Sequence, residues 1–289
     1  MRCGHVRRAY RRLLPKKRRV CLHTWRPRSG SNFGDEMSLD IVAALLTKLG
    51  SPLSPPIARC DCGRRYAHRL LAIGSILHQS RPGDTVWGSG INGKTSAHRY
   101  DFKHVDIRAV RGPLTRRMIV NNGGNCPKIY GDPGLLVCHL FPEVKRQAIA
   151  VPDIEVSLIL NINDLALVRE ASGPSSPVNL ISPSMNWRSV TAEVNRSNFV
   201  ISSSLHGIIL ADALGVPCRP VISLFEPLFK FEDYFMATAR SGLVYARSLD
   251  EALRLGPIPE ASINLKGLLE AFPRDIFAFN AGNPASAVE

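Results

Sequence analysis

Residues 200–217 read VISSSLHGIILADALGVP, and this stretch decides how the rest of the chain is interpreted. Val200 and Ile201 are typical of a short buried strand, and the serines that follow are typical of a turn into a helix. The helical pattern then ends at Gly215 and Pro217. A strand, turn and helix in this order present free backbone N–H groups at the helix N-terminus, where an anion can bind.

His206 stands at this turn, next to Gly207. Imidazole titrates near neutral pH, so a histidine beside an anion site suits the transfer of a group from a phosphorylated donor. A serine N-cap followed by a solvated histidine would give the same sequence, because serine is a common N-cap. The turn by itself leaves both interpretations open.

The composition is that of an ordinary globular protein. The 289 residues are 45% hydrophobic and 21% charged, which is enough for a large core and two domains. No apolar run reaches the roughly 18 residues of a membrane-spanning helix. The seven cysteines are scattered, and Cys60 and Cys62 have no second pair at metal-ligand spacing. This pattern predicts neither a zinc site nor a disulfide framework, and indicates a reducing cytoplasm.

Positive charge is concentrated in residues 1–19, which hold nine Lys and Arg residues and no acid, whereas the whole chain has a formal net charge of +13. The hydrophobic residues of this segment fall near one helical face, and arginines occupy the others. This pattern is typical of a helix lying on an anionic membrane surface, and a solvated tail is the alternative. Nucleic-acid binding is not expected, because no nucleic-acid-binding motif accompanies the charge.

Hydrophobic segments alternate with helical patterns along the chain, and several of the segments end in glycine. The first set comprises strands at 20–25, 70–74, 85–88 and 106–110, with helices at 36–49 and from Leu114. The second comprises strands at 155–161, 178–182, 199–202 and 218–224, with helices at 187–197 and from His206. Such alternation predicts an α/β fold with parallel sheets, whose ligands bind at the carboxyl ends of the strands.

We therefore expect two Rossmann-like domains with a cleft between them, flanked by an arm and a tail. The expected parts are a basic N-terminal arm (1–19), an N-terminal Rossmann-like domain (20–147), a C-terminal Rossmann-like domain with the SSSLHG motif (148–262) and a C-terminal helical tail (263–289). The tail is expected to pack against the first domain. Loops at 59–69 and 226–240 are the candidates for binding an acceptor.

Six segments, in this order, carry a resemblance to a known family. They are Asn32-Phe33-Gly34-Asp35, Gly74 to His78, Val86 to Lys94, Val110 to Pro113, Tyr130 to Leu136 and the SSSLHG turn. Together they resemble the polysaccharide pyruvyl transferase family, and within it the ketal pyruvate transferases of exopolysaccharide synthesis, such as the xanthan enzyme. The resemblance extends from about residue 25 to the Ala271-Phe272-Pro273 tail.

The resemblance implies a GT-B-like fold and a cytoplasmic enzyme that uses phosphoenolpyruvate as its donor. Such enzymes build a cyclic pyruvate ketal across two hydroxyls of a sugar, usually on a lipid-linked oligosaccharide. The basic arm would then hold the enzyme peripherally at the inner face of the cell membrane. Neither a metal nor a cofactor is expected, because arginine and helix dipoles can hold the phosphate.

The resemblance also implies roles for single residues. His206 corresponds to the motif histidine and would be the general acid or base. Arg111 would clamp the phosphate or carboxylate of the donor with its guanidinium fork. Backbone N–H groups of Leu205 and Gly207, with the hydroxyls of Ser203 or Ser204, would add hydrogen bonds.

Another four residues have both a structural and a substrate-binding interpretation: Asn32, Gly34, Asp35 and Asp132. The first three begin a helix, so they either cap it or line the cleft, and Asp132 either forms a turn or binds substrate.

Two departures from the family pattern bear on the site. Many members carry arginine where this chain has Ser204, so Lys230 or Arg219 would supply the missing cation. Leu160-Asn161 stands in place of the usual Pro-His, which would alter the choice of acceptor or the activity.

Two other functions fit parts of the sequence. One is a nucleotide-sugar glycosyltransferase with a GT-B fold, although no pair of acids suited to a ribose lies near His206. The other is a non-catalytic scaffold of a polysaccharide-assembly complex, which would need neither His206 nor Arg111. The sequence does not indicate the acceptor sugar, its hydroxyls, the ketal stereochemistry or the oligomeric state.

Overall fold

The computed structural model describes residues 20–25, 31–50, 58–59, 68–145, 151–165 and 178–277. The expected basic arm, most of the expected acceptor loop at 59–69 and the end of the tail lie outside the described residues.

The first half of the chain forms a five-stranded sheet in the order β2-β1-β3-β4-β5, with every neighbouring pair parallel. Its strands are β1 (Val20–His23), β2 (Ala58–Arg59), β3 (His68–Leu71), β4 (Thr85–Trp87) and β5 (Asp106–Ala109). In the register of the central strands, Leu22 pairs with Leu70 and Leu70 with Thr85. Side chains of β1, β3 and β4 are largely buried, as expected for a parallel sheet covered on both faces.

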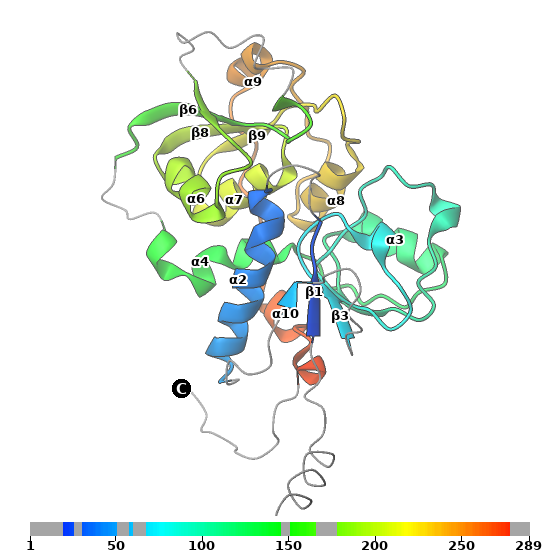
Figure 1. The fold of residues 1–289 in the computed structure, drawn as a ribbon. Helices are drawn as coiled ribbons and strands as arrows, with labels where there is room; N and C mark the ends of the chain where they lie inside the picture. The colour runs from blue at the N-terminus through cyan, green and yellow to red at the C-terminus, as the bar shows by residue number, and fades with distance from the viewer. Residues whose placement is uncertain are drawn as a thin grey trace, which may run out of the picture.

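The second half forms a four-stranded parallel sheet in the order β7-β6-β8-β9. Its strands are β6 (Ile154–Ile159), β7 (Asn179–Ile181), β8 (Ser197–Ser202) and β9 (Cys218–Pro220). The predicted α/β fold with parallel sheets is confirmed by these two sheets. The two sheets occupy the upper and lower parts of Figure 1.

Helices connect and cover the strands. They are α2 (Phe33–Lys48), α3 (Pro113–Asn121), α4 (Val137–Leu140), α6 (Trp187–Asn195), α7 (Leu205–Leu214), α8 (Phe229–Ala237), α9 (Leu249–Leu255) and α10 (Leu265–Glu270). The first of them begins three residues before the predicted start, because the Asn32 side chain accepts a hydrogen bond from the Gly34 N–H and caps it. Two helices that the sequence pattern did not predict, α8 and α9, follow β9.

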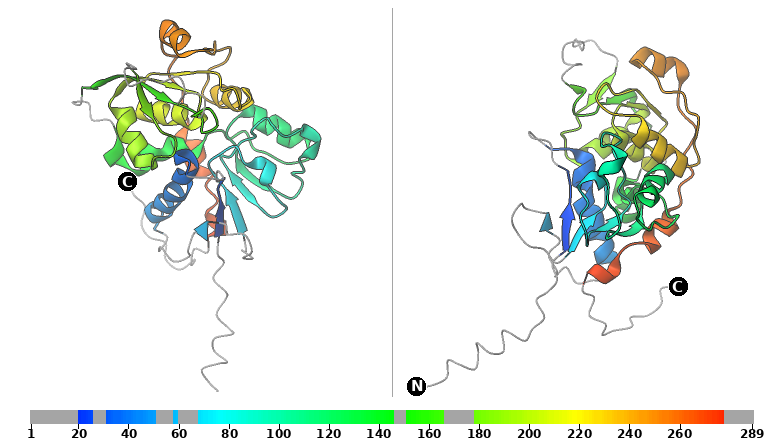
Figure 2. Two further views of the ribbon diagram at one scale, coloured as in Figure 1. Left: turned by 45° about the horizontal axis from the view of Figure 1, so that its top comes forward. Right: turned by 90° about the vertical axis from the view of Figure 1, so that its right-hand side faces the viewer.

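One hydrophobic cluster continues from the first sheet to the second. It contains Leu22 and Trp87 from the first sheet together with Val200 and Ile208 from the second half. Helix α2 packs against α6 and α7 packs against the 3-10 helix η3 (Pro133–Leu136), so elements of each half contact the other. The views in Figures 1 and 2 both place α3 beside α8.

The C-terminal segment returns to the first sheet. The Trp87 Nε1 donates to the Leu268 carbonyl at 2.8 Å, and the Phe272 ring lies 4.9 Å from the Trp87 ring. Beyond it, Asp275 in the 3-10 helix η5 (Arg274–Ile276) forms an ion pair with Arg108 at 2.8 Å. Figure 1 shows α10 beside β1 and β3.

One cysteine of the first sheet forms a disulfide that the sequence did not indicate. Cys21 in β1 is disulfide-bonded, so the expectation of no disulfide is wrong for this cysteine, because spacing in sequence does not report proximity in space.

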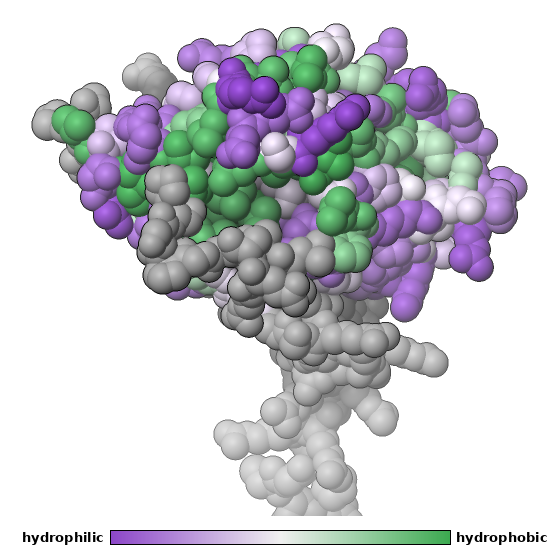
Figure 3. All heavy atoms as spheres, turned by 90° about the horizontal axis from the view of Figure 1, so that it is seen from above, coloured by the Kyte–Doolittle hydropathy of each residue, from purple (hydrophilic) through white to green (hydrophobic). Residues whose placement is uncertain are grey.

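Seen from above, the molecule carries hydrophobic residues in patches among hydrophilic ones (Figure 3). Within the described ranges, no helix has both the length and the apolar character needed to cross a membrane.

Candidate functional site

A cavity of about 240 Å³ lies where the strands of both sheets end. Its lining residues follow the carboxyl ends of six different strands: Trp25 after β1, Ser75 after β3, Asn92 after β4, Asn161 after β6, Ser204 after β8 and Glu226 after β9. Ligands of parallel α/β sheets bind at these ends, where the loops leave the sheet. This cavity is therefore the candidate functional site.

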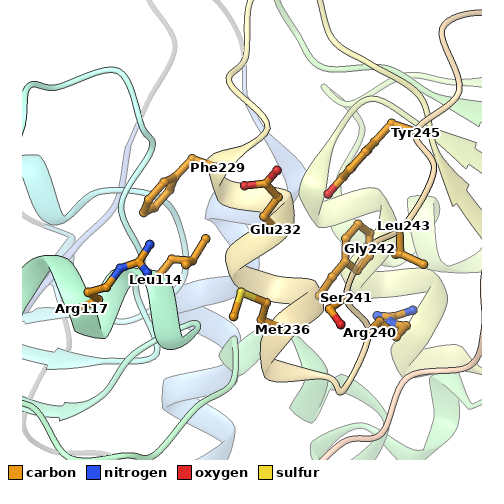
Figure 4. A pocket seen from close by; sticks show the side chains of 11 residues that line it. Leu114, Arg117, Phe229, Glu232, Met236, Arg240, Ser241, Gly242, Leu243 and Tyr245 are labelled. Carbon is orange, nitrogen blue, oxygen red and sulfur yellow. The ribbon is translucent and has the colours of Figure 1, made fainter.

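A second cavity, of about 320 Å³, lies on another side of α8 (Figure 4). Leu114 and Arg117 of α3, Glu232 and Met236 of α8, and Tyr245 are among the residues that line it. It is the larger of the two, and residues of the expected acceptor loop at 226–240, most of which forms helix α8, line it. It contains none of the residues predicted for catalysis or donor binding. We assign the chemistry to the first cavity because Asp35, His206 and the ends of the strands meet there.

The N-termini of α2 and α7 meet at His206. Phe33, the first residue of α2, donates its backbone N–H to the Pro183 carbonyl after β7, which holds α2 against the second half of the chain. A Cβ at Gly34 would lie 2.0 Å from His206 Nδ1, so only glycine leaves room for the imidazole at this position. Asn32 both caps α2 and lines the cavity, so its two predicted roles are combined in one residue.

His206 is held without a proton. Burial lowers its pKa to about 3, and the nearby charges of Lys230 and Arg111 contribute to the shift. The free protein therefore presents a neutral imidazole to the cavity at physiological pH. A neutral imidazole can accept a proton from a substrate hydroxyl, whereas a dianionic ligand beside it would stabilise the protonated form.

Asp35 is held with a proton. Burial raises its pKa to about 8, and the negative charge of Asp132 adds to the effect. Burial likewise raises the pKa of Asp132 to about 6. Asp132 is fully buried at the start of η3, where its Oδ1 accepts from the Gly134 N–H at 2.9 Å. It does not line the cavity. Asp132 thus acts on the site through Asp35.

The raised pKa of Asp35 predicts how stability depends on pH. Because the folded-state pKa lies above the unfolded value of 3.8, the folded protein binds more protons, and stability falls as the pH rises through about 8. Between about pH 6.5 and 8.5, we expect the wild type to lose about 2 kcal/mol relative to Asp35→Asn. Urea unfolding at both pH values measures this difference. The exposed Asp250, changed to Asn, is the control, and an equal loss in the Asp35 variant would contradict the assignment.

Two lysines share one carboxylate at the wall of the cavity. Glu226 lies 2.5 Å from Lys94 Nζ and 2.9 Å from Lys230 Nζ, and it also accepts from Asn163 Nδ2 at 3.3 Å. Burial acts to raise the pKa of Glu226, but the two lysines outweigh it and lower that pKa, so the carboxylate is ionised. The three charged groups together leave one net positive charge. Lys230, predicted as the compensating cation, therefore lies in the cavity.

The serine turn contributes less than predicted from its sequence. Ser204 lines the cavity, but its side chain makes no capping hydrogen bond to α7. The Gly207 N–H already donates to the Ser204 carbonyl at 3.1 Å, so in this structure it is not free to donate to a substrate. Leu205 and His206, both lining the cavity, carry the N–H groups at the start of α7 that can face an anion.

Ser203 faces away from the cavity and belongs to a structural network. Its hydroxyl donates to Asp164 Oδ2 at 2.7 Å and accepts from the Asn161 N–H at 2.8 Å. The other Asp164 oxygen accepts from the Ser223 hydroxyl at 3.0 Å. Asp164 therefore joins the turns after β6, β8 and β9, and sequence reasoning missed it because nothing local marks an acid that bonds residues so distant in sequence.

Arg111 does not present its guanidinium to the cavity. The side chain is fully buried, and it donates to Asp233 Oδ2 at 3.2 Å, Ser75 Oγ at 2.5 Å and the Ile91 carbonyl at 2.7 Å. Its predicted role as an open clamp is therefore not what the structure shows, because the side chain is fully buried and each of its three nitrogens already donates to a protein acceptor. It reaches the cavity only through Ser75. Arg219 is likewise occupied, by the backbone carbonyls of Val244 and Leu255.

The arrangement can bind an anion and move protons. One cavity contains a protonated acid, a neutral base, a buried lysine and two helix N-termini. A pair of groups whose pKa values are displaced in opposite directions is the usual arrangement for acid–base chemistry near neutral pH. In the described residues, no three His, Cys, Asp or Glu side chains are grouped as metal ligands.

Comparisons with known proteins give one family. The sequence pattern of the family described as "Polysaccharide pyruvyl transferase" matches residues 32–223, which include all the predicted site residues except Lys230. The chain is also 28% identical, over 220 residues, to "Succinoglycan biosynthesis protein ExoV" of Rhizobium meliloti (strain 1021). That alignment covers 73% of this chain and 62% of the relative, so the chain spans less than two thirds of the relative's length.

Solved structures give weaker likenesses. A functionally uncharacterised protein, KP1_0663, from Klebsiella pneumoniae is 12% identical, with a TM-score of 0.47 over 80% of this chain and 94% of that one. The wall teichoic acid polymerase TagF is 12% identical, with a TM-score of 0.40 over 90% of this chain and 82% of that one. TM-scores below 0.5 do not establish a shared fold.

Proposed function

Because this chain belongs to the polysaccharide pyruvyl transferase family, we propose that it transfers a pyruvyl group from phosphoenolpyruvate to a sugar of a lipid-linked exopolysaccharide repeat unit, forming a cyclic ketal. The observation that carries the proposal is the pairing of a protonated Asp35 with a neutral His206 in one cavity. A non-catalytic scaffold would not need an acid and a base with pKa values displaced in opposite directions. The two parallel sheets that end at this cavity support a GT-B-like arrangement, with the donor and the acceptor bound between them.

The donor anion would bind at the meeting point of the two helices. The N-termini of α2 and α7 direct their dipoles there, and the Lys230 ammonium adds a full positive charge. Binding of phosphoenolpyruvate would then offset the effect of the Lys230 charge and raise the pKa of His206. Lys230 would take the place of the arginine that many family members carry at the position of Ser204.

Asp35 and His206 would divide the proton transfers between them. Asp35 donates its proton to the vinyl carbon C3, so that C2 becomes cationic, and a sugar hydroxyl attacks C2 while its proton passes to His206. The C2–O bond to phosphate then breaks with its electron pair leaving on the phosphate, and a second hydroxyl closes the ring at C2. Of the two hydroxyl protons, one restores Asp35 and the other leaves with the phosphate.

The test is donor consumption that depends on an acceptor. Purified protein is incubated with phosphoenolpyruvate and membrane extract that contains lipid-linked glycans, and released phosphate is measured beside the mass of the glycan. Pyruvyl transfer predicts one phosphate released for each glycan that gains the mass of one pyruvyl ketal. Incorporation of a sugar from a nucleotide sugar, with no use of phosphoenolpyruvate, would contradict it.

The basic arm is proposed to hold the enzyme at the inner face of the membrane. Residues 1–19 lie outside the described residues, and the proposal rests on their nine basic side chains. Each basic residue near an anionic surface contributes about 1 kcal/mol, so deletion of residues 2–19 should abolish most co-sedimentation with phosphatidylserine vesicles. Turnover of a soluble acceptor should not change. Vesicles of phosphatidylcholine alone are the control, and unchanged co-sedimentation of the deletion variant would contradict the proposal.

A further inference from the structure

The wall of the cavity formed by Glu226 and its partners is held in place by hydrogen bonds to buried groups. The Glu226 N–H donates to the Ser223 hydroxyl at 3.1 Å, and that hydroxyl donates to the buried Asp164. The Glu226 side chain is 9% exposed, and its three partners fix both oxygens. A carboxylate held in this way is a permanent part of the wall, and not a mobile group that occupies the donor's place.

The hydrogen-bonding groups left over at this wall match sugar hydroxyls. Glu226 Oε1 already accepts from Lys94 and Asn163, whereas Oε2 accepts only from Lys230 and keeps a lone pair free. Each ammonium has three N–H groups and uses one of them on Glu226. One free acceptor between several donors suits two neighbouring hydroxyls, of which one donates and the other accepts.

The same wall disfavours an acidic sugar. The two lysines and Glu226 leave one net positive charge, which the donor anion would take, so no charge remains for a second carboxylate. The ionised Glu226 would repel such a group directly. The half-buried Trp25 lines the same cavity and gives an apolar surface for the C–H face of a sugar ring.

We propose that Glu226, Lys94 and Asn163 form the acceptor subsite, and that it selects a neutral hexose by its hydroxyl pair over a uronic acid. The inference rests on the proposed function, since a ketal needs two hydroxyls of one sugar. Glu226 here is a specificity-determining residue and takes no part in proton transfer. His206, against the N-terminus of α2, would remove the hydroxyl proton.

Binding can be tested without turnover. Trp25 lies in the cavity while Trp87 and Trp187 are 0% and 4% exposed, so its fluorescence should report a bound sugar, and Trp25→Phe should remove the signal. Methyl glucoside and methyl glucuronide are titrated as a pair that differs in one carboxylate. We expect the neutral glycoside to bind more tightly to the wild type. Tighter binding of the glucuronide would overturn the proposal.

Glu226→Gln separates the acceptor from the donor. Loss of a hydrogen bond to a charged group should weaken binding of the neutral glycoside by about tenfold or more. It should raise the KM for the glycan acceptor by a similar factor. The KM for phosphoenolpyruvate should stay the same or fall, because a negative charge is removed. Glu232→Gln is the matched control, since that exposed carboxylate lies on α8 and lines the other cavity (Figure 4).

The outcomes distinguish the two proposals. If the neutral glycoside binds through Glu226 but no phosphate is released from phosphoenolpyruvate, the acceptor subsite stands and the proposed function fails. If phosphoenolpyruvate is turned over and Glu226→Gln changes neither glycoside binding nor the acceptor KM, the subsite is wrong. A lower KM for phosphoenolpyruvate with unchanged glycoside binding would show instead that Glu226 competes with the donor.

Discussion

Replacement of His206 by Gln should lower kcat for pyruvyl transfer by about 10²–10⁴-fold, the usual contribution of a general base. The imidazole is unprotonated in the free protein because its pKa is lowered to about 3, and the bound donor dianion would raise its basicity so that it can take the proton of the attacking hydroxyl. Glutamine fills a similar volume and keeps a polar end, but it cannot accept a proton at neutral pH. The rate of phosphate release with saturating phosphoenolpyruvate and acceptor measures the effect.

Folding must be shown to survive this substitution. His206 packs against Gly34, and its ring lies 6.4 Å from that of Phe33, so a smaller side chain would leave a gap. Thermal unfolding of His206→Gln should therefore be compared with that of the wild type, and His98→Gln, at an exposed histidine outside the cavity, serves as the control for activity. A folded His206 variant with wild-type kcat would remove this residue from the chemistry.

Replacement of Arg111 by Met should reduce the free energy of unfolding by about 3–5 kcal/mol, because it leaves a buried carboxylate without its countercharge. Arg111 and Asp233 are both fully buried. Asp233 would keep hydrogen bonds from the Thr115 N–H at 2.8 Å and the Thr115 hydroxyl at 2.6 Å, but among the described residues it would have no ion-pair partner. Chemical denaturation of the purified variant measures the loss.

Arg117→Met is the matched control, since Arg117 is an exposed arginine on the same helix, α3. Its loss should change stability by well under about 1 kcal/mol. Adding Asp233→Asn to Arg111→Met should recover part of the stability by removing the unpaired charge. If Arg111→Met and Arg117→Met are equally stable, the buried ion pair does not stabilise the fold, and an open, ligand-facing Arg111 becomes the better interpretation.

The regular elements near the strand ends could be predicted from the sequence because their signals are local. The segment Val200–Pro217 contains the strand end, the turn and the glycine stop, and the structure places α7 at Leu205–Leu214 as that pattern indicates. Helix α8 could not be predicted in the same way. Its nine residues bury side chains on several faces, including Lys230 and Asp233, so no clean amphipathic pattern marks it.

The candidate site was predictable only in part, because much of it depends on pairs distant in sequence. Lys230 and Asp35, both predicted as site residues, line the cavity. The burial of Arg111 depends on Asp233, a residue 122 positions away, and the protonation of Asp35 depends first on its burial and then on the charge of Asp132. A single sequence carries no sign of either pairing, so a clamp was predicted where the structure has a buried ion pair.

The return of the C-terminal segment to the first sheet has a consequence for synthesis on the ribosome. Trp87 lies in the fourth strand of that sheet, but Leu268 and Phe272, which bond and cover it, are translated about 180 residues later. Chains grow from the N-terminus at a limited rate, and domains normally fold in that order. Here the half of the protein made first keeps an uncovered tryptophan until the last helix emerges. A nascent chain halted before residue 265 would therefore be a substrate for chaperones, although both of its sheets were already complete.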